Sequence, residues 1–134
     1  MSLRGDFQSF KRALSEDAVA SVRINGFKNA DLKGESVPWC STGIYLPERP
    51  VFTLDPNFHA GAYYVQEASS MFLEQAVRSS VDLTKSLRVL DLCAAPGGKS
   101  THLLQLINNE SLLVSNEVIR TRGQHTFGEH TKMG

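Results

Sequence analysis

The stretch between residues 88 and 101, which reads RVLDLCAAPGGKST, contains the residue types most suited to binding a ligand. A short apolar run ends in an acid, Asp91, and a turn of small residues with two adjacent glycines then leads into an amphipathic segment. This order predicts a strand, a tight turn and the start of a helix. Paired glycines let a ligand approach the backbone closely, and the N–H groups at the start of a helix favour a negative group.

Three kinds of ligand-binding turn compete for this stretch. A Walker loop needs G-x-x-x-x-G-K-[ST]. The last three positions of this pattern are matched from Gly98 onward, but Cys93 occupies the position of the first glycine. The dinucleotide fingerprint G-x-G-x-x-G fails as well, because the turn has only two adjacent glycines. An acid closing a strand before a small-residue turn suits S-adenosylmethionine, whose amino-acid end and adenosine need close backbone and one or two carboxylates. An ordinary strand–turn–helix connection is the alternative.

A second strand is expected at residues 112–115, which read LLVS and are followed by Asn116 and Glu117. The order strand, helix, strand predicts two parallel neighbouring strands joined by a right-handed crossover. An acid at the end of the second strand can accept hydrogen bonds from both hydroxyls of a ribose, as it does in dinucleotide folds. Glu117 is therefore the predicted ribose ligand.

Composition limits the classes of protein to which this chain can belong. With 14 basic and 14 acidic residues among 134, the formal net charge is zero, so any contact with RNA must come from local patches. No run of 18 apolar residues occurs, and the N-terminus lacks the apolar core of a signal peptide, so we expect no membrane span. Cys40 and Cys93 form no CxxC pair, which predicts neither zinc ligands nor a disulfide framework and favours a cytoplasmic protein.

The segments before the turn have patterns of their own. Residues 5–20 show helical spacing, and we expect this helix to pack on the strand that follows it. Residues 21–25 alternate as a half-buried strand does, with Arg23 as an exposed member. A further short strand is predicted at residues 51–54. A helix is predicted at residues 67–79, with these side chains facing inward: Met71, Phe72, Ala76 and Val77.

Several motifs resemble those of the Sun (NOL/NOP/Sun) family of RNA cytosine-5 methyltransferases. DLCAAPGGKS resembles the family's cofactor motif DxCAAPGGKT, with Ser100 in place of the usual threonine. SVRIN resembles the element SIRLNP, and residues 58–71 resemble the element that opens the methyltransferase domain. Glu117 and Arg122 match the family's pattern NExxxxR. The resemblance extends from residue 21 to residue 122.

The resemblance implies an α/β fold with two parts. A small α+β ferredoxin-like domain that faces RNA is expected at residues 1–57, and the first part of an incomplete Rossmann-like methyltransferase domain is expected at residues 58–122. In relatives Gln66 and Ser70 sit near the cofactor, although capping and packing roles remain equally open for them. The residues expected to bind the cofactor are Asp91, Cys93, Ala94, Ala95, Pro96, Gly97, Gly98, Lys99, Glu117 and Arg122.

The resemblance also implies a reaction, the transfer of a methyl group from S-adenosyl-L-methionine to carbon 5 of cytosine in RNA. Ribosomal RNA is the first expectation for the substrate and transfer RNA the second. Relatives carry their two catalytic cysteines in a Pro-Cys and a Thr-Cys motif, and neither motif occurs in this sequence. We therefore assign no catalytic residue and expect the chain by itself to be inactive. The alternatives are a non-catalytic RNA-binding module and, more weakly, a mononucleotide-binding enzyme.

Two further expectations concern the C-terminal half. The apolar strand around Val89 should expose an edge, which predicts self-association, most simply as a homodimer. After Arg122 the sequence reads GQHTFGEHTKMG and lacks helical periodicity, so residues 123–134 are expected to be an aberrant or disordered tail. Our hypothesis is a frameshift or cloning truncation, because another reading frame is compatible with an amphipathic segment like that of the family. Sequencing the gene on either side of the Arg122 codon tests it.

Overall fold

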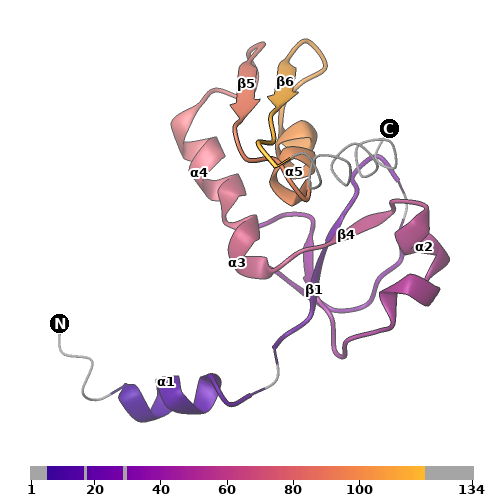
Figure 1. Ribbon diagram of the computed structural model, residues 1–134, viewed down its shortest axis with the longest axis vertical. Coiled ribbons are helices and arrows are strands. Elements are labelled where there is room, and N and C mark those ends of the chain that lie inside the picture. The colour runs from indigo at the N-terminus through magenta and orange to yellow at the C-terminus, as the bar shows by residue number, and fades with distance from the viewer. Residues whose placement is uncertain (1–5, 17, 29, 120–134) are drawn as a thin grey trace.

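The computed structural model describes residues 6–16, 18–28 and 30–119, which form a mixed α/β arrangement with two small sheets (Figure 1). The first sheet is antiparallel, with the strand order β2-β3-β1-β4. Its strands are β1 (Ser21–Ile24), β2 (Glu35–Ser36), β3 (Gly43–Tyr45) and β4 (Tyr63–Val65). The second sheet is a parallel pair made of β5 (Arg88–Asp91) and β6 (Leu112–Ser115).

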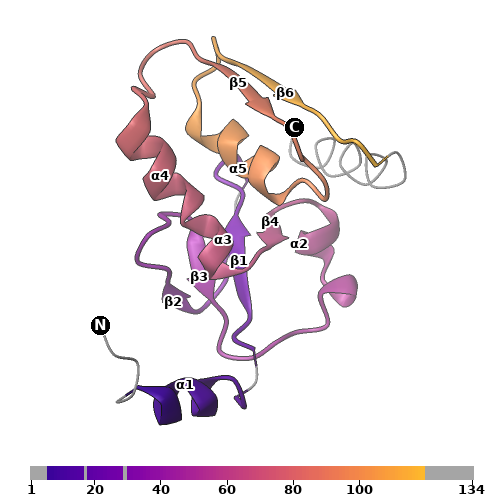
Figure 2. The same cartoon turned by 60° about the vertical axis from the view of Figure 1, so that its left-hand side comes forward.

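The described helices are short. They are α1 (Phe7–Ala13), the 3-10 turn η1 (Phe52–Leu54), α2 (Pro56–His59), α3 (Ala68–Met71), α4 (Leu73–Ser80) and α5 (Gly98–Leu106). Figure 2 shows α5 between the two sheets, while α1 stands apart at the N-terminal end. None of the helices in the described residues is long and apolar enough to cross a membrane.

The strand β1 is the centre of the first sheet, because β3 pairs with one edge of it and β4 with the other. The predicted strand is confirmed, but the prediction that Arg23 is exposed is wrong. Arg23 has no exposed surface, and its neighbours Ser21 and Val22 are also buried. The alternating pattern predicted the wrong exposure for Arg23, because helices cover the face of β1 that was assumed to be in contact with solvent. The guanidinium of Arg23 contacts Thr101 in α5.

The first sheet extends past residue 57, where the sequence predicted a boundary between domains. The strand β4 comes after that point and still pairs with β1, through Val22 and Val65 among other partners. A ferredoxin-like arrangement of this part is not confirmed, since the structure shows an antiparallel sheet in the order β2-β3-β1-β4. The division into domains stays a prediction.

The strand–helix–strand unit predicted after residue 87 is confirmed. The strands β5 and β6 pair in parallel from Arg88 with Leu112 to Asp91 with Ser115, and α5 connects them. The strand β5 ends at Asp91 and β6 covers residues 112–115, as predicted, and α5 begins at the second of the two adjacent glycines. Two strands alone do not confirm a complete Rossmann-like sheet.

Other local predictions are wrong. The helix α1 does not pack on the next strand, because all its residues are exposed, Phe7 and Phe10 included. Within residues 51–54, where a strand was expected, Phe52–Leu54 form the 3-10 turn η1. The helix expected at residues 67–79 divides at Phe72 into α3 and α4, which leaves Phe72 exposed and buries Glu74.

A small core beside the first sheet consists of Val37, Cys40 and Met71. Trp39 packs against this core, and its indole N–H donates to the carbonyl of Ala68 at 2.6 Å. Trp39 therefore has a packing role beside this core. Residues 120–134, which include Arg122 and the predicted tail, lie outside the described residues.

Candidate functional site

Asp91 ends β5 and organises the turn that follows it. One carboxylate oxygen accepts a hydrogen bond from the backbone N–H of Cys93 at 3.2 Å. The other accepts from the hydroxyl of Ser100 at 2.6 Å. The carboxylate thus ties the start of the turn to the first turn of α5, and both of its oxygens are engaged within the turn.

Two glycines shape the middle of the turn for different reasons. Gly97 has a φ of 111°, a left-handed conformation that L side chains rarely adopt. Its N–H donates to the carbonyl of Ala94 at 2.7 Å, and its carbonyl accepts the N–H of Thr101 at 2.8 Å, so α5 begins directly after it. At Gly98 a larger residue would be crowded, because a Cβ there would lie 3.2 Å from Cε1 of Tyr64.

The end of β6 holds the turn from the opposite side. Asn116 donates its backbone N–H to the carbonyl of Asp91 at 2.7 Å, and its own carbonyl accepts the N–H of Ala94 at 2.9 Å. The carboxylate of Glu117 accepts the N–H of Ala95 at 3.1 Å and that of Ile119 at 2.8 Å. Glu117 therefore lies against the turn, at the carboxyl end of its strand.

A cleft of about 210 Å³ separates the turn from the segment that joins β4 to α3. The hydroxyl of Tyr64 spans the two walls by donating to the carbonyl of Pro96 at 3.1 Å. One wall comes from Tyr64, Val65, Gln66, Glu67 and Ser70, and the other from Cys93, Ala94, Ala95, Pro96, Gly98 and Lys99.

The ten residues predicted to bind a cofactor thus occupy different places. Six of them line the cleft, as do Gln66 and Ser70. Asp91, Gly97 and Glu117 are absent from its lining and hold the turn in shape. Arg122 lies outside the described residues. Cys93, which lines the cleft, is exposed.

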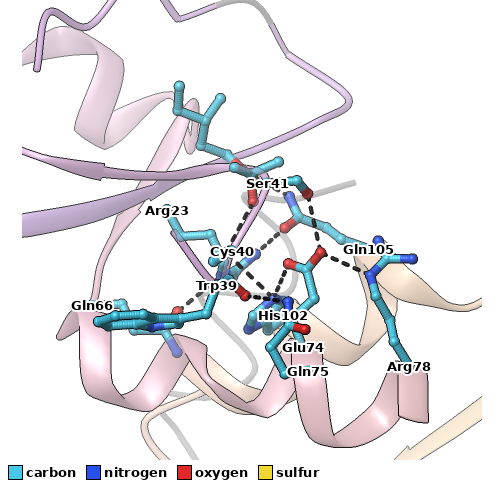
Figure 3. Close-up of polar contacts among 12 residues, drawn as sticks. Arg23, Trp39, Cys40, Ser41, Gln66, Glu74, Gln75, Arg78, His102 and Gln105 are labelled. Carbon is cyan, nitrogen blue, oxygen red and sulfur yellow. Dashed lines mark hydrogen bonds and ion pairs between the residues drawn. The ribbon is translucent and has the colours of Figure 1, made fainter. Parts of the chain in front are cut away.

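Arg23, which was not predicted to belong to the site, donates hydrogen bonds to residues of both walls of the cleft, and Figure 3 shows it beside Gln66. Its Nε donates to Oε1 of Gln66 at 2.9 Å, and its Nη2 donates to the hydroxyl of Thr101 at 2.7 Å and to the carbonyl of Gly98 at 3.3 Å. A further bond runs from Nη1 to Oε1 of Gln105. Burial lowers the pKa of Arg23 to about 10, so the guanidinium is still charged at neutral pH. Its place in the element SVRIN was the only sign of such a role in the sequence.

Comparison with known proteins decides the family. The N-terminal domain of 16S rRNA methyltransferase RsmF matches residues 1–68, just over half of the chain. The chain belongs to the 16S rRNA methyltransferase RsmF family. The 16S rRNA methyltransferase RsmB/F family matches residues 79–134. The family resemblance predicted from the sequence is confirmed.

Members of the RsmF family among the curated proteins are considerably longer than this chain. The ribosomal RNA small subunit methyltransferase F of Shewanella woodyi is 31% identical over 142 residues, covering 96% of this chain and 29% of its own length. The protein of the same name from Vibrio atlanticus is 35% identical over 133 residues, covering 87% of this chain and 27% of its own length. The chain therefore spans less than a third of these relatives.

A solved structure supports the same fold. The crystal structure of PH0851 superposes on this chain with a TM-score of 0.77 and 26% sequence identity. The match covers 97% of this chain and 31% of PH0851. The arrangement of the two sheets around α5 is thus shared with part of a larger protein.

Proposed function

We propose that this chain forms the N-terminal part of an S-adenosyl-L-methionine-dependent RNA methyltransferase that acts on carbon 5 of cytosine in small-subunit ribosomal RNA. The observation that carries the proposal is the cleft between the turn after β5 and the segment 64–70. Family membership supports the RNA methyltransferase part of the proposal. Ribosomal RNA is the preferred substrate because the matching families are named for it, and transfer RNA is second.

The residues present fit the cofactor. At Gly98 a side chain would project toward Tyr64 and Gln66 across the cleft, so the missing Cβ keeps the backbone open to a ligand. The first N–H groups of α5 have no partner within the helix, and with the ammonium of Lys99 they suit the carboxylate of an amino acid. We assign the methionine end of the cofactor to this wall.

The adenosine end belongs beside Glu117 in this proposal. Glu117 lies against the turn at the carboxyl end of its strand, where a carboxylate can accept hydrogen bonds from the hydroxyls of a ribose. Arg122 completes the matching pattern in the sequence and is assigned to the same end. The rest of the protein would extend β5 and β6 into a Rossmann-like sheet, and the first sheet would contact RNA.

The proposed mechanism divides the work between this chain and the part of the relatives that it does not span. The cofactor supplies a methyl group on a sulfonium, which is electrophilic. The residues of this chain bind and orient it, and the attack on the pyrimidine needs a thiolate beside the ring. Burial raises the pKa of Cys40, which disfavours the thiolate, and Cys93 stands outside the Pro-Cys and Thr-Cys contexts of the family. We therefore propose cofactor binding without methyl transfer by this chain alone.

Calorimetry with S-adenosylhomocysteine tests the proposal on the 134-residue chain. We expect binding that Gly98→Ala weakens by about tenfold, or ~1.4 kcal/mol, because the added Cβ would crowd the Tyr64 wall of the cleft. Gly26→Ala is the matched control, since a Cβ there would meet nothing within 4 Å. Salt-sensitive binding of RNA without any binding of the cofactor would favour the non-catalytic RNA-binding module instead.

A further inference from the structure

Three side chains that are far apart in the sequence converge in the interior, away from the cleft. Cys40 lies between β2 and β3, Glu74 in α4 and His102 in α5 (Figure 3). Their sulfur, carboxylate and imidazole atoms all lie within 4.8 Å of one another. Each residue is at most 3% exposed. The two helices contact each other, and the β2–β3 connection brings the thiol onto them.

The distances within this cluster are compatible with three ligands of one metal ion. Nε2 of His102 lies 3.8 Å from Sγ of Cys40 and 3.3 Å from Oε2 of Glu74. Tetrahedral zinc, with bonds of about 2.3 Å to sulfur and about 2.0–2.2 Å to nitrogen and oxygen, holds its ligand atoms about 3.3–3.6 Å apart. A charge-assisted hydrogen bond between imidazole and carboxylate is shorter, about 2.7–2.9 Å. The nitrogen–oxygen distance of 3.3 Å falls within the range for neighbouring zinc ligands, and the nitrogen–sulfur distance of 3.8 Å exceeds it slightly.

The carboxylate of Glu74 is oriented for this role. Its Oε1 accepts from Nε of Arg78 at 2.9 Å and from the hydroxyl of Ser41 at 3.1 Å, which leaves Oε2 facing His102. Supporting bonds of this kind fix ligand carboxylates in metal sites. The thiol is held in place as well, because the backbone around Cys40 forms turns, with Cys40 N–H donating to the carbonyl of Val37 at 3.1 Å.

The charges around the cluster are compatible with a divalent cation. A thiolate at Cys40 and the carboxylate of Glu74 balance two positive charges. Arg23 directs its donors to oxygens of Gln66, Gly98, Thr101 and Gln105, and Arg78 has a half-exposed side chain that solvent screens. A cavity of about 180 Å³ is lined by Glu74 and His102 among others, which gives an ion a route inward and leaves room for water as a fourth ligand.

We propose that Cys40, Glu74 and His102 bind one zinc ion, which joins the first sheet to α4 and α5. A set of one sulfur, one nitrogen and one oxygen is typical of zinc and cobalt among the common divalent ions. The three ligands are far apart in the sequence, at positions 40, 74 and 102, so they form no short motif from which a metal site could be predicted. Because the ion connects segments that are otherwise linked by side-chain contacts, its role is to stabilise the fold.

Cobalt is the probe that separates this site from adventitious binding. The 134-residue chain, freed of metal with a chelator and titrated with Co²⁺, should bind one ion and develop a thiolate-to-cobalt charge-transfer band. Cys40→Ser should abolish that band, and His102→Gln should weaken binding of the ion at least tenfold. Two control variants should keep the band: Cys93→Ser, which removes the exposed cysteine, and the double variant His125→Gln and His130→Gln, which removes the histidines near the C-terminus.

Thermal unfolding of the chain without substitutions is a second test, and its result does not depend on whether the variants fold. Saturating Zn²⁺ should raise the Tm of the metal-free chain by roughly 5–15 °C, and a chelator should reverse the shift. A chain with no charge-transfer band and the same Tm with and without Zn²⁺ contains only a hydrogen-bonded cluster, and the proposal is then wrong. A band lost in Cys93→Ser or in the histidine double variant would show an adventitious ion only and would equally overturn it.

Discussion

Arg23 and Gln66 are joined by a hydrogen bond of 2.9 Å between Nε and Oε1, although 43 residues separate them in the sequence. Gln66 lines the cleft, and the same guanidinium also donates to Thr101 and to the carbonyl of Gly98 on the opposite side. A residue in the centre of the first sheet thus fixes the distance between the two walls of the cleft. The sheet acts as the support of the site, and Arg23 is a positioning residue within it.

Replacing Arg23 should destabilise the whole chain. We expect Arg23→Met to lower the free energy of unfolding by about 2–3 kcal/mol, because it leaves Gln66, Gln105 and Thr101 without their charged donor in a buried place. Urea denaturation followed by circular dichroism measures the change. Arg88→Met is the matched control, since Arg88 is exposed at the start of β5. Equal effects of the two substitutions would mean that the buried guanidinium makes no net contribution.

The left-handed glycine of the turn gives a second prediction. Gly97→Ala should cost about 1–2 kcal/mol of stability, because a Cβ is strained at a φ of 111° whatever space surrounds it. Thermal unfolding compares this variant with Gly26→Ala, where nothing lies within 4 Å of an added Cβ and φ is not left-handed. A Gly97→Ala chain as stable as the control would show that the turn adopts another conformation in solution.

Glu117 gives a third prediction, which rests on the proposed cofactor site. In a full-length relative with a glutamate at the equivalent position, replacing it by alanine should weaken cofactor binding by about 1–3 kcal/mol, the range for hydrogen bonds to charged groups. In the present chain Glu117→Ala also removes the acceptor for the N–H of Ala95, so the turn itself loosens. Calorimetry measures the affinity, and Glu110→Ala provides a control on an exposed acid of the α5–β6 connection. Unchanged affinity would remove Glu117 from the site.

A feature that depends on neighbouring residues in the sequence was predicted correctly, whereas one that depends on residues far apart in the sequence was not. The turn after β5 was foreseen because its determinants are local: an acid ends a strand, Gly97 takes a left-handed conformation and a helix follows at once. The burial of Arg23 was not foreseen, since the residues that cover it come from a helix about 80 positions further along the chain. Phe72 and Ala76 were expected to face inward but are exposed, because the predicted helix divides at Phe72 into α3 and α4.

The last prediction concerns the second sheet, of which only one face is covered within the described residues. The side chains of Val89 and Leu113 are partly buried on the side of α5, whereas Leu90 and Val114, which are paired across the strands, are 58% and 48% exposed. Parallel sheets are normally covered on both faces, and an apolar strand edge is a template for pairing with another chain.

We therefore expect the 134-residue chain to self-associate at micromolar concentration through this face and the free strand edge beside it, most simply as a two-fold dimer. Light scattering measures the mass. Leu90→Asp should shift the equilibrium toward the monomer, because it places a charge where an apolar surface would be buried. Leu54→Asp changes an equally apolar side chain, 79% exposed in η1 and distant in sequence from this sheet, and should leave the mass unchanged. A chain that is strictly monomeric and unfolds cooperatively would show that residues beyond position 119 or another segment of the same molecule cover the exposed face.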